Sequence, residues 1–224
     1  CYLSFSMGCS IKSIGLKAMT PILQDTVTSF EQETDIQTAA EAAPALFKLL
    51  EGILVGEPRN SKYLILATRL EGMYAFGILE DQAEELDTDQ ARERVRLYNA
   101  RARAYGFRLL DIKFPGFRKS CEGGADGLAA YLKVAAKKKD AEALFWTGFA
   151  WAGEIQYSLD IPDRVAELPL VKEVMLRVKE LDPAIFYGGP DLFLGVYYGG
   201  RSKMLGGNPE KAVEHFEAAK KATG

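Results

Sequence analysis

The spacing of apolar residues in the last third of the chain is the feature that most constrains its fold. Four residues follow one another at steps of four, three and five: Val171, Met175, Val178 and Pro183. Three later residues repeat the steps of four and three: Ala212, Phe216 and Ala219. Such steps return a side chain to one face of an α-helix, and a proline beyond the turn ends the helix. The spacing therefore predicts helices that pack through one narrow face.

This order of small, bulky and small residues, followed by proline, is typical of the second helix of a tetratricopeptide repeat. Upstream, Gly195 and Tyr198 have the spacing of the first helix. An earlier pair is less regular, with Thr147, Gly148 and Trp151 at the corresponding positions. Glycine lets two helices approach closely, and an aromatic side chain fills the hole that small residues leave. We therefore predict an all-α fold of cryptic tetratricopeptide-like helix pairs that form a short solenoid.

Charge and composition restrict the class of partner. Of the 224 residues, 48% are hydrophobic and 26% are charged, which is typical of an ordinary globular protein. The net charge of −3 argues against nucleic acid, which usually needs a basic stripe. The basic run Lys137-Lys138-Lys139 lies at an expected helix end, where it complements the helix dipole. We therefore expect no nucleic-acid partner.

The sequence lacks the common catalytic and cofactor-binding motifs. The chain has no Gly-rich phosphate loop, HExxH, serine elbow or CxxC. Its three cysteines, Cys1, Cys9 and Cys121, are too few for a disulfide framework and are wrongly spaced for zinc, and Cys121 is expected to be a free thiol. The single histidine, His215, excludes a His-pair metal site and is expected on a half-exposed surface. We predict no enzyme activity, no cofactor and no metal site.

The N-terminus has features of a secreted lipoprotein. Residues 1–9 are interpreted as the remnant of a signal peptide that ends in a loose lipobox, Ser6-Met7-Gly8-Cys9. Acylation of Cys9 would attach the protein to a membrane without a spanning helix, and Ser10 favours the outer membrane by its resemblance to bacterial sorting signals. The alternative is that Cys9 is buried or incidental. Residues 10–34 are expected to form a tether with one short helix around Pro21.

Residues 35–224 are assigned to one helical domain. A proline normally occupies the first turn, so Pro44 predicts that the first helix of the domain begins near Ala42. Mid-helix Gly72 and Gly77 indicate close approach by a neighbour. Because no end cap follows the last helix, further C-terminal chain is expected beyond the sequence given. The first predicted helix lies within 39–55, the next five span 61–86, 89–110, 126–138, 140–158 and 170–181, and two more begin at 189 and 209.

Two loop aromatics, Phe114 and Phe117, leave two interpretations open. They lie in a Phe-Pro-Gly-Phe break between predicted helices. If exposed, they would mark a contact surface; if buried, they would plug the solenoid, which is the interpretation that we favour.

The sequence from Gly188 to Tyr198, followed by Leu205 to Ala212, resembles the T component of TRAP (tripartite ATP-independent periplasmic) transporters. The resemblance extends from about Ala39 onward and is strongest between Phe145 and Ala219. It departs from the family at Asp191, where a histidine is expected. The resemblance implies a periplasmic lipoprotein that associates with the solute-binding P component, conveys a small hydrophobic organic acid and forms a homotrimer around a pore.

Aromatic residues near the Gly-rich bends are the candidates for lining a cleft that binds a ligand or a partner protein. One interpretation is that they form the core of the repeats. The other is that they line a groove for an apolar or amphipathic ligand, or for a partner surface, because Tyr and Trp combine apolar faces with polar tips. Arg201 is the candidate partner for a carboxylate at the mouth, with an ordinary surface arginine as the alternative. The predicted cleft residues are Trp146, Trp151, Tyr187, Phe193, Tyr197, Tyr198 and Arg201.

The sequence supports two main functional hypotheses. The first is an accessory T component of a TRAP system, which binds the P component and a small organic acid. The second is a membrane-tethered, tetratricopeptide-like scaffold for protein–protein interactions in the cell envelope, which binds no small ligand. An enzyme is the third and weakest alternative, since no nucleophile stands beside a base in the sequence.

Overall fold

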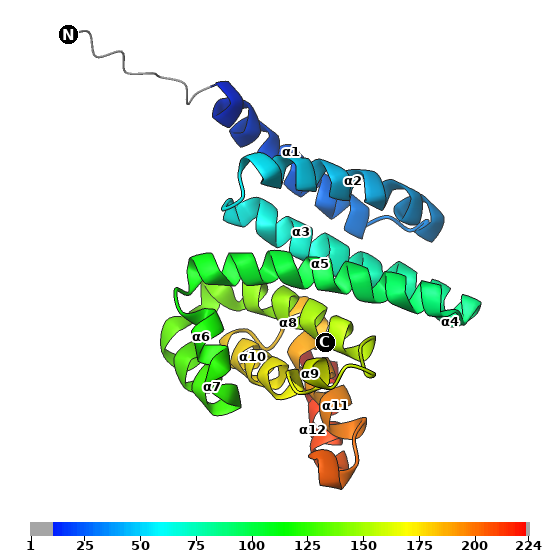
Figure 1. Cartoon of the computed structure of the whole chain (residues 1–224), viewed down its shortest axis with the longest axis vertical. Helices are drawn as coiled ribbons and strands as arrows, with labels where there is room; N and C mark the ends of the chain where they lie inside the picture. Colours follow the sequence, from blue (N-terminus) through cyan, green and yellow to red (C-terminus); the bar gives the residue numbers. More distant parts are fainter. Residues whose placement is uncertain (1–10, 223–224) are drawn as a thin grey trace, which may run out of the picture.

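The computed structural model describes residues 11–222, with side chains from residue 19 onward (Figure 1). All regular elements in this range are helices, and residues 11–222 contain no strand. The predicted all-α class is therefore confirmed for the part of the chain that the structure describes. The lipobox and the predicted acylation site Cys9 lie outside the described residues.

The N-terminal segment is more ordered than a tether. Helix α1, Ile11–Glu31, fills most of the range 10–34, where we expected one short helix. Its Leu23 and Val27 are buried, and the hydroxyls of Thr20 and Tyr63 are 2.8 Å apart. Helix α1 therefore packs on α3 as part of the core.

Helix α2, Ile36–Gly56, begins earlier than predicted. The Asp35 side chain accepts hydrogen bonds from the backbone N–H groups of Gln37 and Thr38, at 2.9 and 3.4 Å. This cap satisfies N–H groups that would otherwise lack partners, so the helix starts at Ile36 and Pro44 lies in its interior. The predicted start near Ala42 is therefore wrong.

The next helical segment contains an irregular turn. Helix α3, Ser61–Tyr74, is capped by Asn60 and continues through the π-helix η1, Ala75–Leu79, into α4, Glu80–Leu86. The N–H of Glu80 bonds to the carbonyl of Ala75, five residues back. A π turn inside a helix adds one residue and redirects the side chains after it. The apolar side chains on the inner face of this segment are all buried: Leu64, Ala67, Leu70, Tyr74 and Ile78.

Two long helices pack closely at the centre of the molecule (Figure 1). Helix α5, Asp89–Lys113, lies between α3 and α8, Ala141–Gln156. A Cβ atom added to Gly106 would lie 2.5 Å from Thr147 Oγ1, and one added to Gly153 would lie 2.4 Å from Asn99 Oδ1. Both distances are far below van der Waals contact, so these two glycines allow the axes of α5 and α8 to approach.

A short helical corner closes one side of the core. It comprises α6, Phe117–Glu122, α7, Gly124–Ala135, and the 3-10 turn η2, Lys138–Asp140. Phe114 and Phe117 are both buried, and the Phe117 ring packs edge-on against Phe107 at 5.6 Å. Both aromatics are therefore buried core residues, and the interpretation as an exposed contact surface is wrong.

The C-terminal third consists of short helices in pairs. They are α9, Pro162–Val165, α10, Leu168–Leu181, α11, Ile185–Gly199, the 3-10 turn η3, Lys203–Leu205, and α12, Pro209–Ala222. Asn208 Oδ1 accepts a hydrogen bond from the backbone N–H of Lys211 at 2.9 Å and caps α12.

The predicted contacts between glycine and a bulky side chain occur in both helix pairs. A Cβ added to Gly148 of α8 would lie 3.0 Å from the Met175 side chain of α10. A Cβ added to Gly195 of α11 would lie 2.5 Å from the Phe216 ring of α12. The helices that the spacing pattern predicted to pack closely are therefore in close contact at Gly148 and Gly195.

We predict opposite effects for two glycine-to-alanine changes. Gly106→Ala should lower the free energy of unfolding by about 1–3 kcal/mol, because the added methyl overlaps the buried Thr147 side chain. Gly52→Ala, inside α2, should raise it by up to about 1 kcal/mol, because no atom lies within 4 Å and alanine favours helix. Urea denaturation measures both, and equal effects of the two changes would contradict the close packing of α5 and α8.

Candidate binding surfaces

The structure distributes the seven predicted cleft residues over three places. Trp146 and Tyr187 belong to one aromatic group, whereas Trp151 is buried against α5. The remaining four lie along α11 and in the turn after it: Phe193, Tyr197, Tyr198 and Arg201. Ligand binding by any of them stays a prediction, but they do not line one common cleft.

The first group forms an aromatic band, defined by Phe76, Phe145, Trp146, Phe149, Phe186 and Tyr187. Its ring centroids follow one another at 5.4 Å from Phe76 to Phe149, 5.7 Å from Phe149 to Trp146 and 4.7 Å from Trp146 to Phe186. The centre is buried, while Phe76 and Tyr187 at the two ends are 56% and 73% exposed. The band thus joins the core to the surface at two points, and sequence reasoning missed Phe76.

Irregular backbone positions both ends of the aromatic band. Phe76 lies in the π-helix η1. At the other end Phe186, Tyr187 and Gly188 have φ angles of 45°, 56° and 73°, which interrupt α11 before its regular part begins near the predicted Gly189. Left-handed φ is unfavourable for residues with a Cβ, and such strain often accompanies binding sites. A Cβ on Gly188 would lie 3.0 Å from Ala219 Cα, so packing holds this turn in place.

A charged group lies over the middle of the aromatic band. The Arg69 guanidinium lies 5.6 Å from the centre of the Trp146 ring and forms ion pairs with Glu31 and Glu142. Such a cation over an indole face combines an apolar surface with a fixed polar group. The centre of the aromatic band therefore combines an apolar ring, Trp146, with a charged group, Arg69.

Arg201 contacts an aromatic ring and no carboxylate among the described residues. Its guanidinium lies 3.2 Å from the centre of the Tyr197 ring, and its Nε donates to the Tyr197 carbonyl at 3.0 Å. Tyr197 in turn packs near Phe193 and Tyr198, at centroid distances of 6.0 and 5.2 Å. These residues of α11 and the turn after it form a cluster separate from the aromatic band.

A polar cluster around the buried Asp191 joins helices α10, α11 and α12. The buried Asp191 carboxylate of α11 lies 2.6 Å from both Lys179 Nζ of α10 and His215 Nδ1 of α12. The His215 ring stacks on Tyr198, with 8° between the planes. The side chain of His215 is only 14% exposed, so the predicted half-exposed surface position is wrong. No local spacing pattern in the sequence connects these residues.

Two glutamates near η1 favour their protonated forms. Burial raises the pKa of Glu71 from 4.5 to about 7, although the neighbouring Arg101 opposes this shift. Burial also raises the pKa of Glu80 from 4.5 to about 7, and the nearby Asp81 adds to the shift. Glu71 Oε1 accepts from Arg101 at 2.7 Å, while its buried Oε2 has no partner. Desolvation therefore dominates the electrostatics at both ends of the π turn.

Residues 11–222 hold no group of three or more His, Cys, Asp or Glu side chains arranged for a metal ion. Cys121 is a free thiol, and burial raises its pKa from 9.0 to about 11. In the same range, none of the helices has the length and apolar character needed to cross a membrane.

The fold places the described chain among all-α proteins built from packed helix pairs. The chain belongs to the TRAP transporter T-component family, whose profile matches residues 32–224. It is also 23% identical, over 233 aligned residues, to a protein of Treponema pallidum (strain Nichols) described only as an uncharacterized protein. That match covers 94% of this chain and 71% of the Treponema protein. Membership suggests an accessory role in transport, and TRAP components are associated with the cell envelope.

We predict that Glu80→Gln stabilises the protein in a pH-dependent way. A raised carboxyl pKa favours folding below pH 4.5, and this contribution is lost as the pH rises from 4.5 to about 7. Allowing for partial exposure, the variant should gain about 1 kcal/mol at pH 8 and nothing at pH 4. Urea denaturation at both pH values measures this, and the same gain at both would contradict the assigned ionisation of Glu80.

Proposed function

We propose that this protein is an accessory component of a TRAP transport system that binds the periplasmic solute-binding protein, the P component. The observation that carries the proposal is the family match over residues 32–224. The protein acts by binding and conveyance, without covalent chemistry. A small hydrophobic organic acid is the proposed cargo.

The aromatic band is the proposed contact surface. Its ends, Phe76 and Tyr187, are large exposed rings held by packed neighbours. Aromatic residues are enriched in protein interfaces and at their energetic centres, and rigid rings lose little conformational entropy on binding. The buried Trp146 and the overlying Arg69 supply an apolar floor and a polar group for an amphipathic ligand beside the same surface.

The assembly of the protein in the envelope is proposed on the same basis. Residues 35–224 form a short solenoid of cryptic tetratricopeptide-like pairs, which packs as a homotrimer. Acylated Cys9 attaches it to the periplasmic side of the outer membrane. The sequential packing of α10, α11 and α12 supports a solenoid at the C-terminal end of the described residues.

A second candidate function is a membrane-tethered scaffold for envelope proteins, without a small ligand. Exposed apolar side chains on the α11–α12 hairpin favour it, since Val196, Met204 and Leu205 are all largely exposed. Organic acids should raise the melting temperature only under the transport proposal, because a ligand that binds only the folded state stabilises it.

We predict that the immobilised protein binds a purified TRAP P component from the same host, measured by biolayer interferometry. The double variant Phe76→Ala/Tyr187→Ala should weaken binding at least about tenfold, because truncated interface anchors cost 1–2 kcal/mol or more each. The matched control is Val55→Ala/Val134→Ala, which truncates two exposed apolar side chains away from the aromatic band. Absence of binding by the wild-type protein would refute the proposed function, and equal losses in both variants would refute the band as the contact surface.

A further inference from the structure

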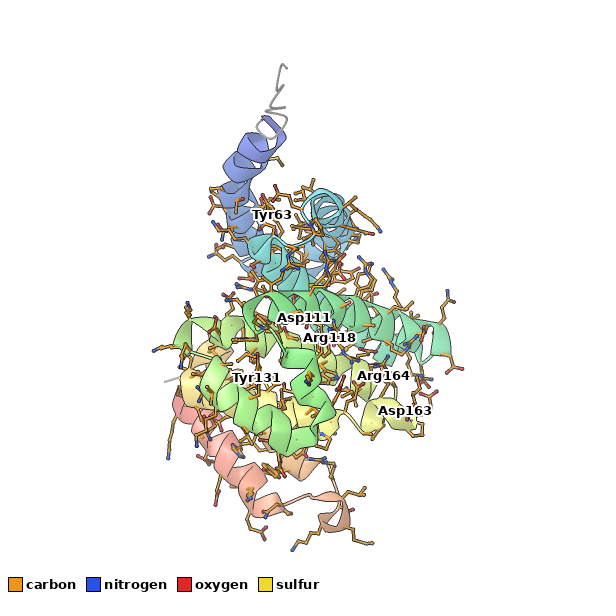
Figure 2. All side chains as sticks on the ribbon, turned by 60° about the vertical axis from the view of Figure 1, so that its left-hand side comes forward. Tyr63, Asp111, Arg118, Tyr131, Asp163 and Arg164 are labelled. Carbon is orange, nitrogen blue, oxygen red and sulfur yellow. The ribbon has the colours of Figure 1, made fainter. Side chains whose placement is uncertain are left out.

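An open groove of about 530 Å³ runs beside α5, between this helix and parts of α6, α8 and α9. Four arginines line it: Arg103 and Arg108 from α5, Arg118 from α6 and Arg164 from α9. Phe107 contributes an apolar floor. Figure 2 labels Arg118 and Arg164 on their two short helices. We call this feature the arginine groove; it shares no residue with the aromatic band.

The inner part of the arginine groove is fixed by ion pairs. Arg103 bonds Glu154 at 2.8 Å and Glu167 at 2.9 Å, and Arg164 pairs with the same two carboxylates at 3.4 and 3.1 Å. Arg103 is 12% exposed and Glu154 is 5% exposed, so this part is shielded from water. Shielded, multiply paired side chains are held in one geometry and provide a rigid base.

The outer arginines keep unused donors. Arg118 donates from Nε to Asp111 at 2.7 Å, and its terminal nitrogens bond to no described residue. Arg108 donates from one terminal nitrogen to the Pro58 carbonyl at 2.7 Å and has no carboxylate partner. A guanidinium carries five N–H donors, so both side chains have several that no described residue accepts.

The charges in the arginine groove do not balance. Its four arginines face three carboxylates, those of Glu154, Glu167 and Asp111, which leaves one positive charge unmatched. The whole chain carries a net charge of −3, so this local excess opposes the overall sign. A local patch of opposite sign attracts and orients an acidic partner that the rest of the surface repels.

We infer that the arginine groove binds an acidic segment of a protein partner. The Asp or Glu side chains of this segment accept hydrogen bonds from the N–H groups of Arg108 and Arg118 that no described residue uses. The arginine fork binds carboxylates in a bidentate way, and arginine is enriched in protein interfaces. The groove is open at its rim, where Arg118 is 56% exposed. Sites for small ligands instead enclose most of the ligand surface.

The probe is a synthetic, fluorescein-labelled helical peptide of about sixteen residues, or about four helical turns, with Glu at every third or fourth position. Its control peptide has Gln in place of each Glu. Fluorescence anisotropy measures binding to the wild-type protein, to Arg108→Glu/Arg118→Glu and to the milder Arg108→Gln/Arg118→Gln. Lys62→Glu/Lys203→Glu is the matched control, because it changes the net charge equally at exposed positions outside the groove.

The wild-type protein and the lysine control should bind the acidic peptide but not the Gln control peptide. This binding should weaken as salt is added. The Glu double variant should bind at least about tenfold more weakly, and the Gln variant several-fold more weakly. Circular dichroism establishes that each variant is folded, and the Gln variant keeps the test valid if charge reversal prevents folding.

Equal binding by groove and control variants, or no binding by the folded wild-type protein, overturns the inference. Free succinate is tested alongside the peptide. If it stabilises the wild-type protein but not the groove variants, while the peptide fails to bind, the groove is a small-anion site and the inference is wrong. Because the test uses no TRAP protein, its result is independent of the proposed transport function.

Discussion

The close approach of α5 and α8 is the constraint on which the rest of the structure depends. The Thr147 side chain packs against Gly106, and the Asn99 side chain packs against Gly153. These two contacts lie at opposite ends of the interface between the antiparallel helices α5 and α8. A single added methyl at either glycine would require the opposing Thr147 or Asn99 side chain, or the helix that carries it, to shift. Helix α3 packs on both members of this pair, and α10 packs on α8.

Both candidate surfaces depend on α8 because this helix contributes to each of them. Trp146 and Phe149 belong to the aromatic band, whereas Glu154 lines the arginine groove. The polar cluster of Asp191, Lys179 and His215 then holds α11 and α12 on α10, and α11 carries Tyr187. One rigid core therefore positions an aromatic surface and a cationic surface that share no residue, so that two contacts can be made independently.

Spacing along the chain predicted most of the long helices and some of their contacts, but it missed α6, α9 and most of the length of α1. The four-and-three steps predicted that Gly148 and Gly195 would meet bulky side chains, and they meet Met175 and Phe216. The mid-helix position of Gly77 also predicted close approach by a neighbour, and that prediction is wrong, because no atom lies within 4 Å of a Cβ added there. A glycine shows that close approach is possible, but only the path of the neighbouring helix decides whether it occurs.

The candidate site was less predictable because proximity in sequence does not determine which face a side chain occupies. Trp146 and Trp151 are five residues apart, about 140° around the helix, and they contact different neighbours. Phe76, which is seventy residues before Trp146 in the sequence, also belongs to the aromatic band. It lies in a π turn that no sequence motif predicts. The Asp191 cluster and the arginine groove likewise combine residues from separate helices, which a single sequence does not connect.

The most direct test of the account is amide hydrogen exchange of this protein alone and mixed with a purified TRAP P component from the same host, its proposed partner. The account predicts slower exchange on mixing at Ala75–Leu79 and at Phe186–Gly188, the two irregular segments that hold the exposed ends of the aromatic band. Unchanged exchange in both segments, with protection confined to α1 and α2, would contradict it.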